Sequence, residues 1–109
     1  MSMRLPPVIH AYFDAEKSRD AEAASRRFAE TAIVRDDGES YVGRDSIQKW
    51  MADSIEKHAC TVEPFSVADD GSRIIVISHV AGEFPGSPVD LRYFFILEND
   101  RIVDLEIVL

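Results

Sequence analysis

The stretch Phe28–Trp50, FAETAIVRDDGESYVGRDSIQKW, decides how the rest of this chain is arranged. The run Ala32–Arg35 is typical of a short strand, and Asp37-Gly38 is a dipeptide that favours tight hairpin turns. Residues Glu39 to Val42 can return as the partner strand, and Gly43 ends it. We therefore predict a small β-hairpin in this stretch.

An amphipathic helix is predicted directly after the hairpin. Asp45 or Ser46 can cap its start. The apolar residues that follow recur at helical spacing, at i, i+3, i+4 and i+8: Ile47, Trp50, Met51 and Ile55. This spacing places Trp50 on the inner face of the helix, and we expect His58 on a helix surface.

Two more helices are predicted before the hairpin. Pro6-Pro7 marks the start of the first, because proline is tolerated in the first turn. Its buried face carries residues at i, i+3, i+4 and i+7: Ile9, Tyr12, Phe13 and Glu16. Asp20 is a good N-cap for the second helix, which has a narrow apolar stripe of Ala21, Ala24 and Phe28.

Beyond Cys60 the pattern changes to strands separated by turns. Four strands are predicted: Thr61–Ala68, Arg73–Glu83, Val89–Glu98 and Arg101–Leu109. Consecutive strands joined by tight turns pair in antiparallel fashion. Helices grouped in one part of the chain cover one face of such a sheet. We therefore expect a single α+β domain over residues 1–109.

The predicted strands carry apolar residues on both faces. In Val89–Glu98, one face has Leu91, Tyr93, Phe95 and Leu97, and the other has Phe94 and Ile96 beside Arg92. An antiparallel sheet with one solvated face alternates more cleanly between apolar and polar residues. We expect the helices to cover one face and a second copy of the chain to cover much of the other, which predicts a homodimer formed through the sheet.

Composition limits the classes of partner. The 109 residues include 12 Lys plus Arg and 20 Asp plus Glu, which gives a net charge of −8 and argues against nucleic acid and membrane surfaces. Hydrophobic residues make up 46% of the chain, enough for a core without disulfides. Cys60 is the only cysteine, and no Cys/His cluster has metal-ligand spacing. With no signal peptide or transmembrane run, we expect a cytoplasmic domain without metal or cofactor.

Several short motifs together span nearly the whole chain. They are Tyr12, Asp20, Phe28–Ala32, Asp36–Gly38, Gly43–Ile47, Trp50, Leu91–Leu97 and Arg101–Ile107. With them the chain resembles the nuclear transport factor 2 superfamily, which has a cone-shaped, cystatin-like fold, and within it the small bacterial SnoaL-like proteins. The resemblance implies three helices packed in the concave face of a curved, mainly antiparallel sheet.

The same resemblance implies an apolar pocket with a few polar groups at its base. Members of the superfamily include isomerases, cyclases, dehydratases and epoxide hydrolases, as well as many binding proteins. The walls that it implies here are Trp50, Phe13, Phe94, Leu105 and Ile107. For Trp50 the alternative is simple packing in the core beneath its helix.

Beside the ketosteroid isomerase pattern, Tyr12 matches the oxyanion-hole tyrosine and Asp36 matches the general-base aspartate. The third element of that pattern, a protonated aspartate on the fifth strand, is replaced here by Arg92. An arginine can stabilise an enolate or hold a carboxylate, but it cannot act as a neutral acid. His79, on an apolar strand, is a further candidate acid–base group.

Each of these residues also has a structural interpretation. Asp36 can be a polar residue of the hairpin turn, or it can form an ion pair with Arg92. Tyr12 can be a core aromatic residue, and His79 can lie on the dimer face. Two functions follow: an enzyme that transfers protons on a small apolar molecule without a cofactor, and a non-catalytic dimeric module that binds a ligand or a protein.

Overall fold

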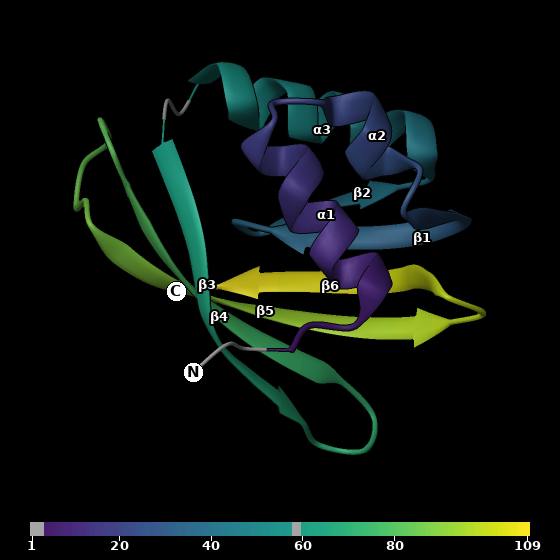
Figure 1. Cartoon of the computed structure of the whole chain (residues 1–109). Coiled ribbons are helices and arrows are strands. Elements are labelled where there is room, and N and C mark those ends of the chain that lie inside the picture. Colours follow the sequence, from purple (N-terminus) through teal and green to yellow (C-terminus); the bar gives the residue numbers. More distant parts are fainter. Residues whose placement is uncertain (1–3, 58–59) are drawn as a thin grey trace.

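The computed structural model describes residues 4–57 and 60–109, so the position predicted for His58 lies outside the described residues. Within these described residues, three helices and six strands follow one another (Figure 1). In order they are α1 (Pro7–Lys17), α2 (Ala21–Ser25), β1 (Phe28–Asp36), β2 (Glu39–Val42), α3 (Arg44–Lys57), β3 (Cys60–Asp69), β4 (Ile74–Gly82), β5 (Val89–Glu98) and β6 (Arg101–Val108). The predicted element order is confirmed.

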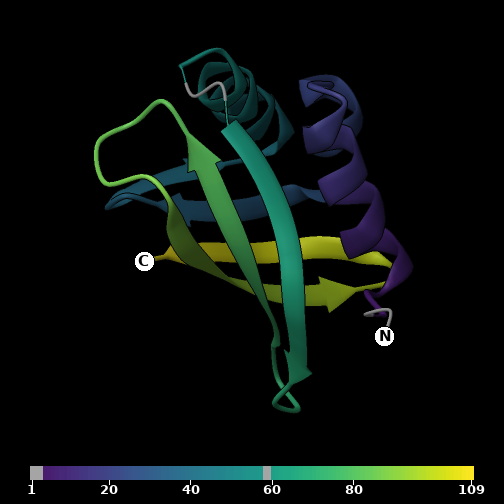
Figure 2. The same cartoon turned by 60° about the vertical axis from the view of Figure 1, so that its left-hand side comes forward.

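The six strands form one open, mixed sheet in the order β2-β1-β6-β5-β4-β3. The predicted hairpin is the antiparallel pair β1–β2, and β3 to β6 form the predicted antiparallel meander. The link between these two parts is a parallel ladder between β1 and β6, which sequence analysis did not predict. The sheet is strongly curved, so that β3 and β4 run across the direction of β1 and β6 (Figure 2).

The helices lie against the concave face of the sheet, and the core fills the space between them (Figure 1). Its centre is aromatic: Tyr12 on α1 makes edge-to-face contacts with Phe28 and Phe95, each with ring centroids 5.8 Å apart. All three side chains are completely buried. Such burial drives folding, and edge-to-face ring pairs add to it. The α+β architecture with helices in a concave sheet is therefore confirmed.

Phe28 belongs to β1, and its predicted place on the second helix is wrong. Helix α2 ends at Ser25, and the N–H of Arg26 bonds back to the carbonyl of Glu22. Phe28 then pairs with Ile102 of β6, and the N–H of Ile102 donates to the carbonyl of Arg27 at 2.9 Å. The long-range ladder therefore extends the strand back to a residue that local spacing had assigned to the helix.

The start of α3 also differs from the prediction. The helix begins at Arg44, because Gly43 accepts the bond from the N–H of Ile47 at 3.0 Å. Gly43 has φ +89°, a conformation that a side chain disfavours. Asp45 consequently lies in the first turn of the helix instead of capping it. The cap predicted for α2 is confirmed, because Oδ1 of Asp20 accepts from the N–H of Ala23 at 3.0 Å.

The hairpin turn fixes the position of Asp36. Asp37 and Gly38 have φ values of 53° and 78°, the left-handed pair that suits a two-residue hairpin turn. Asp36 is thereby the last residue of β1, where it pairs with Ile107 of β6. Because Val34 and Leu105, two positions earlier, are buried on the concave face, Asp36 and Ile107 share that face. The position of the turn therefore places the carboxylate of Asp36 on the concave face of the sheet.

Candidate functional site

A cavity of about 1300 Å³ lies at the end of the concave face where β1 and β6 finish. Four carboxylates line it: Glu16 on α1, Asp36 and Asp37 at the hairpin, and Glu63 on β3. Two cations, Lys17 and Arg19, lie in the same lining, and Lys17 pairs with Glu63. Much of the remaining wall is apolar: Trp50, Ile55, Val62, Val80, Phe84, Val89, Leu91, Tyr93 and Ile107. A concave apolar site with a few convergent polar groups is the usual form of a small-molecule site.

Asp36 lines this cavity as well as preceding the hairpin turn. Its side chain is half-buried, and its Oδ2 accepts a hydrogen bond of 3.1 Å from the indole Nε1 of Trp50. Trp50 is itself only 7% exposed, so this donor is held in place by the packing of α3. The carboxylate of Asp36 is thus oriented by a rigid neighbour.

Glu16 is a second carboxylate at this cavity, and sequence analysis did not select it. Its Oε1 is buried and has no hydrogen-bond partner among the described residues. Burial, followed by the negative charge of Asp36, raises the pKa of Glu16 from 4.5 to about 7. A signal existed: Glu16 stands at the i+7 position of the buried stripe of α1, where Ile9, Tyr12 and Phe13 are the other members.

Tyr12 lies in the core and is not among the residues that line the cavity. Its hydroxyl oxygen is buried without a hydrogen-bond partner among the described residues. The pKa of Tyr12 is raised well above its usual value by burial first and then by Glu16. Tyr93 on β5, in contrast, does line the cavity, and burial followed by Glu16 raises its pKa well above the usual value too. Tyr12 is therefore placed as the structural interpretation expects, as an aromatic residue of the core.

Arg92 and His79 lie on the convex face, away from the cavity. On β5 the residues on either side of Arg92, Leu91 and Tyr93, line the cavity, so strand alternation turns Arg92 outward. Its Nη2 donates to the carbonyl of Leu109 at 2.8 Å, and the ion pair considered with Asp36 is not among those that the described residues form. His79 faces Asp90 across the β4–β5 ladder, with Nδ1 3.0 Å from Oδ1.

The five predicted wall residues divide between three places. Trp50 and Ile107 line the cavity. Phe13 and Leu105 lie in the buried core and are not part of its lining. Phe94 is on the convex face, where the guanidinium carbon of Arg73 lies 4.5 Å from its ring centroid. The family pattern therefore placed four of the five residues correctly on the concave side of the sheet. It failed for Phe94 because both faces of β5 are apolar, and the sequence does not show which face the helices cover.

Cys60 also borders the cavity. Partial burial, and then the charge of Glu16, raises the pKa of its thiol, so the thiol stays protonated at neutral pH and is a poor nucleophile. Within the described residues, no three His, Cys, Asp or Glu side chains gather in a way that could hold a metal ion. None of the helices described is long and apolar enough to cross a membrane. The candidates for acid–base chemistry at the cavity are therefore its carboxylates, which share the lining with the cations of Lys17 and Arg19.

The family model of the SnoaL-like domain matches residues 9–105 of the sequence. The chain belongs to the SnoaL-like domain family. A search of curated proteins finds no match. The match runs from the second residue after the start of α1 to the middle of β6, so most residues of the cavity lie within the SnoaL-like domain.

Solved structures with the same architecture include a candidate polyketide cyclase from Sinorhizobium meliloti. It is 38% identical, with a TM-score of 0.91, and the match covers 95% of each chain. A hypothetical protein from Catenulispora acidiphila with a ketosteroid isomerase-like fold, solved in complex with trimethylamine, is 17% identical, with a TM-score of 0.85 and coverage of 97% of this chain and 87% of that one. The epoxide hydrolase/cyclase-like enzyme SalBIII of salinomycin pyran-ring formation is 19% identical, with a TM-score of 0.77 and coverage of 93% and 86%. The last two show the fold alone.

Proposed function

We propose that this SnoaL-like domain is a cofactor-independent enzyme that transfers a proton on a small apolar substrate, in a reaction of the isomerase, cyclase or dehydratase type. The observation that carries the proposal is that Glu16 and Asp36 face one apolar-walled cavity, close enough for the charge of Asp36 to raise the pKa of Glu16. Two carboxylates in different environments are the usual basis of acid–base catalysis near neutral pH.

The two carboxylates would have different roles. Asp36, held by the indole N–H of Trp50, would take a proton from a carbon atom next to a carbonyl group of the substrate. Glu16, with a pKa of about 7, is partly protonated at neutral pH and would donate its proton to the oxygen on which negative charge develops. The apolar walls would hold the carbon skeleton and exclude water.

The candidate polyketide cyclase from Sinorhizobium meliloti supports this reaction class, because it shares 38% identity over nearly all of both chains. Cyclisation of a polyketide begins with removal of a proton beside a carbonyl group, the step assigned here to Asp36. The SalBIII enzyme has the same fold and is described as epoxide hydrolase/cyclase-like. A cyclase or isomerase of a small carbonyl compound is therefore the form of the proposal to test first.

The test is hydrogen exchange at carbon. Cyclic enones and β-keto esters would be incubated with the protein in D2O, and loss of the proton signal beside the carbonyl group would be followed by NMR. We expect catalysed exchange that falls about 100-fold or more in Asp36→Asn, since a general base contributes about that factor or more. Asp53→Asn is the matched control, because Asp53 is exposed on α3 and does not line the cavity.

Two results would decide against the proposal. Exchange that is unchanged in Asp36→Asn would remove Asp36 from the role of base. Tight binding of these compounds with no exchange above the buffer rate would favour the second function, a ligand-binding module with the same cavity.

A further inference from the structure

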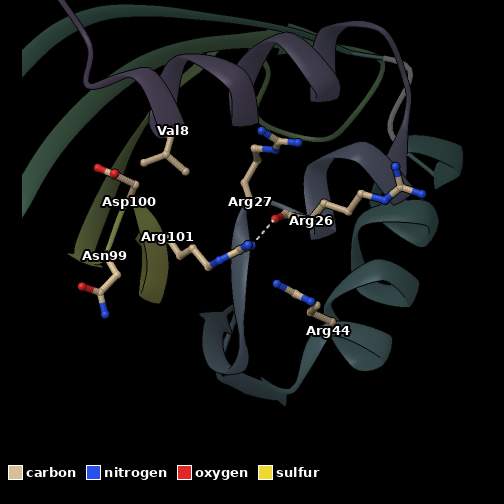
Figure 3. Close-up of a pocket in the computed structure, with 7 residues that line it drawn as sticks. All are labelled: Val8, Arg26, Arg27, Arg44, Asn99, Asp100 and Arg101. Atoms are coloured by element: carbon tan, nitrogen blue, oxygen red, sulfur yellow. Dashed lines mark hydrogen bonds between the residues drawn. The ribbon is translucent and has the colours of Figure 1, made fainter.

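A second cavity, of about 530 Å³, lies at the opposite end of the molecule and shares no lining residue with the first. It is lined by residues at the start of α1 and α3, the junction of α2 with β1, and the turn between β5 and β6 (Figure 3). Four of its residues are arginines: Arg26, Arg27, Arg44 and Arg101. We call this site the arginine cleft.

The arginine cleft is unusual for this chain because the chain is acidic. The net charge is −8, yet four of the 12 basic residues meet here, and Asp100 is the only acidic residue among the described residues of the lining. Like charges held close together repel one another unless a counter-charge is present. The four arginines come from three separate parts of the chain, so helical or strand periodicity does not explain their meeting.

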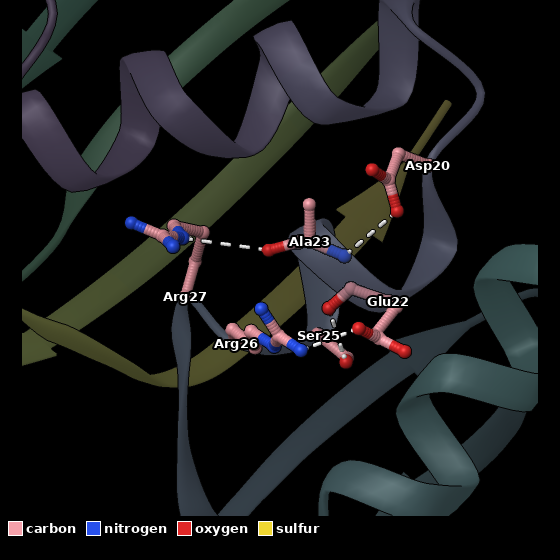
Figure 4. Close-up of polar contacts among 6 residues, drawn as sticks. All are labelled: Asp20, Glu22, Ala23, Ser25, Arg26 and Arg27. Atoms are coloured by element: carbon pink, nitrogen blue, oxygen red, sulfur yellow. Dashed lines mark hydrogen bonds and ion pairs between the residues drawn. The ribbon is translucent and has the colours of Figure 1, made fainter.

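Three of the arginines are anchored to one short piece of backbone. Nε of Arg27 donates to the carbonyl of Ala23 at 3.4 Å (Figure 4), and Nε of Arg44 donates to that of Phe28 at 2.8 Å. Nη1 of Arg101 donates to the carbonyl of Arg26 at 3.1 Å, and the guanidinium groups of Arg44 and Arg101 point toward one another (Figure 3). The cations are thus positioned before any ligand arrives.

These anchors leave most of the donors unused. A guanidinium group has five N–H donors, and each anchor uses one of them. No carboxylate in the described ranges forms an ion pair with Arg27, Arg44 or Arg101. Arg26 differs, because its Nη2 pairs with Oε1 of Glu22 on α2 (Figure 4). The charge available to a ligand therefore comes from the other three arginines.

We propose that the arginine cleft binds a phosphate group, either as inorganic phosphate or as a small phosphate monoester. A phosphate group carries about 1.5 to 2 negative charges near neutral pH and offers at least three oxygens that accept hydrogen bonds, which suits several guanidinium forks better than a single carboxylate does. A nucleic acid does not suit the site, because its further phosphates would meet a surface with a large excess of acidic residues. The ligand is therefore a small molecule.

Calorimetric titration of the whole chain at low ionic strength tests the proposal, with inorganic phosphate, phenyl phosphate and malonate as probes. We expect saturable binding of phosphate or phenyl phosphate, and the tighter of the two identifies the source of the group. Arg44→Gln and Arg101→Gln should each weaken that binding about tenfold or more, since a hydrogen bond to a charged group contributes about 1.5–3 kcal/mol. Added salt should weaken it as well.

Arg92→Gln is the matched control. It removes the same charge from an arginine that is also anchored to a carbonyl, that of Leu109, but on the convex face. It should leave phosphate binding nearly unchanged. If the glutamine variants unfold, Arg44→Lys keeps the charge and loses the fork, and it should weaken binding while the chain stays folded.

Three outcomes would overturn the proposal. The first is the absence of saturable binding of either phosphate to the folded chain. The second is tighter binding of malonate than of both phosphates. The third is an equal loss of affinity in Arg92→Gln and Arg44→Gln, which would show attraction by overall charge alone. None of these outcomes depends on whether Asp36 is a catalytic base.

Discussion

The indole Nε1 of Trp50 donates a hydrogen bond of 3.1 Å to Oδ2 of Asp36, and through this bond α3 holds the end of β1. Trp50→Phe removes the donor and keeps an aromatic ring. We expect the free energy of unfolding to fall by about 2 kcal/mol, from the lost hydrogen bond to a charged acceptor and the lost indole contacts. Urea denaturation of the variant and of wild type measures this difference in the free energy of unfolding. Tyr41→Phe, beside the Trp50 ring, is the control, and equal stability of Trp50→Phe and wild type would contradict the prediction.

Asp36 and Glu16 should titrate as coupled groups. The charge of Asp36 contributes to the raised pKa of Glu16, so Asp36→Asn should lower the pKa of Glu16 toward its usual value while burial keeps it partly raised. A carbon-13 NMR titration of the glutamate side-chain carboxyl groups measures this shift. Asp53→Asn should leave it unchanged. A Glu16 pKa that is the same in Asp36→Asn and wild type would show that the two carboxylates do not interact.

Glu16 should also make stability depend on pH. Its pKa is 4.5 when unfolded and about 7 when folded, so between these values the folded chain binds more protons. The stabilising effect of protonation is complete below about pH 4.5 and is lost as the pH rises to about 7. Glu16→Gln has no group that ionises at this position, so its stability does not fall in this way as the pH rises. The variant should therefore gain about 2 kcal/mol relative to wild type across that range, since one pKa unit is about 1.4 kcal/mol and the side chain is partly solvated. Denaturation of both proteins at several pH values measures this difference. If the free energy of unfolding changes with pH in the same way in both proteins, the prediction is refuted.

Tyr12→Phe separates the catalytic and structural interpretations of Tyr12. Its hydroxyl oxygen is buried without a partner among the described residues, and an unsatisfied buried polar group costs about 1–3 kcal/mol. We expect the variant to be at least as stable as wild type in thermal unfolding. Carbon exchange in the cavity should not change, since Tyr12 does not line it. A large loss of exchange in a stable variant would place Tyr12 in the reaction after all.

The convex face of the sheet carries partly exposed apolar residues: Ile75, Ile77, Phe94 and Ile96. We propose that two copies of the chain pair through this face. Sedimentation at micromolar concentration should then give a dimer, and Ile75→Glu should give a monomer because it places a charge in the interface. Val42→Glu, at a residue 61% exposed on β2, is the control and should stay dimeric. A monomeric wild-type chain would refute the dimer.

The sequence predicted the local elements well because their signals are local. Asp37-Gly38 located the hairpin, and the spacing of Ile9, Tyr12 and Phe13 located the buried face of α1. The parallel ladder of β1 with β6 was missed because it joins distant segments and no short motif specifies it. Because Phe28 takes part in this ladder, it lies in β1 and not in the second helix.

The candidate site was predicted only in part, for two physical reasons. Arg92 was assigned to it because it stands where the ketosteroid isomerase pattern has its protonated aspartate, and the apolar residues on both faces of β5 did not show that Arg92 lies on the convex face. Glu16 was passed over because a single acidic residue at the end of an apolar stripe resembles the solvated end of a helix. Only the packed structure shows that its Oε1 is enclosed.

The ladder between β1 and β6 has a consequence for synthesis of the chain. Arg35 and Asp104, which form an ion pair across it at 2.8 Å, are 69 positions apart in the sequence. On the ribosome, the hairpin and α1 to α3 are made before β6, so the inner edge of β1 stays unpaired until β6 has been translated. Partners this distant in sequence form late and slowly. A nascent chain stalled before residue 101 should therefore expose this edge, and with it a tendency to aggregate.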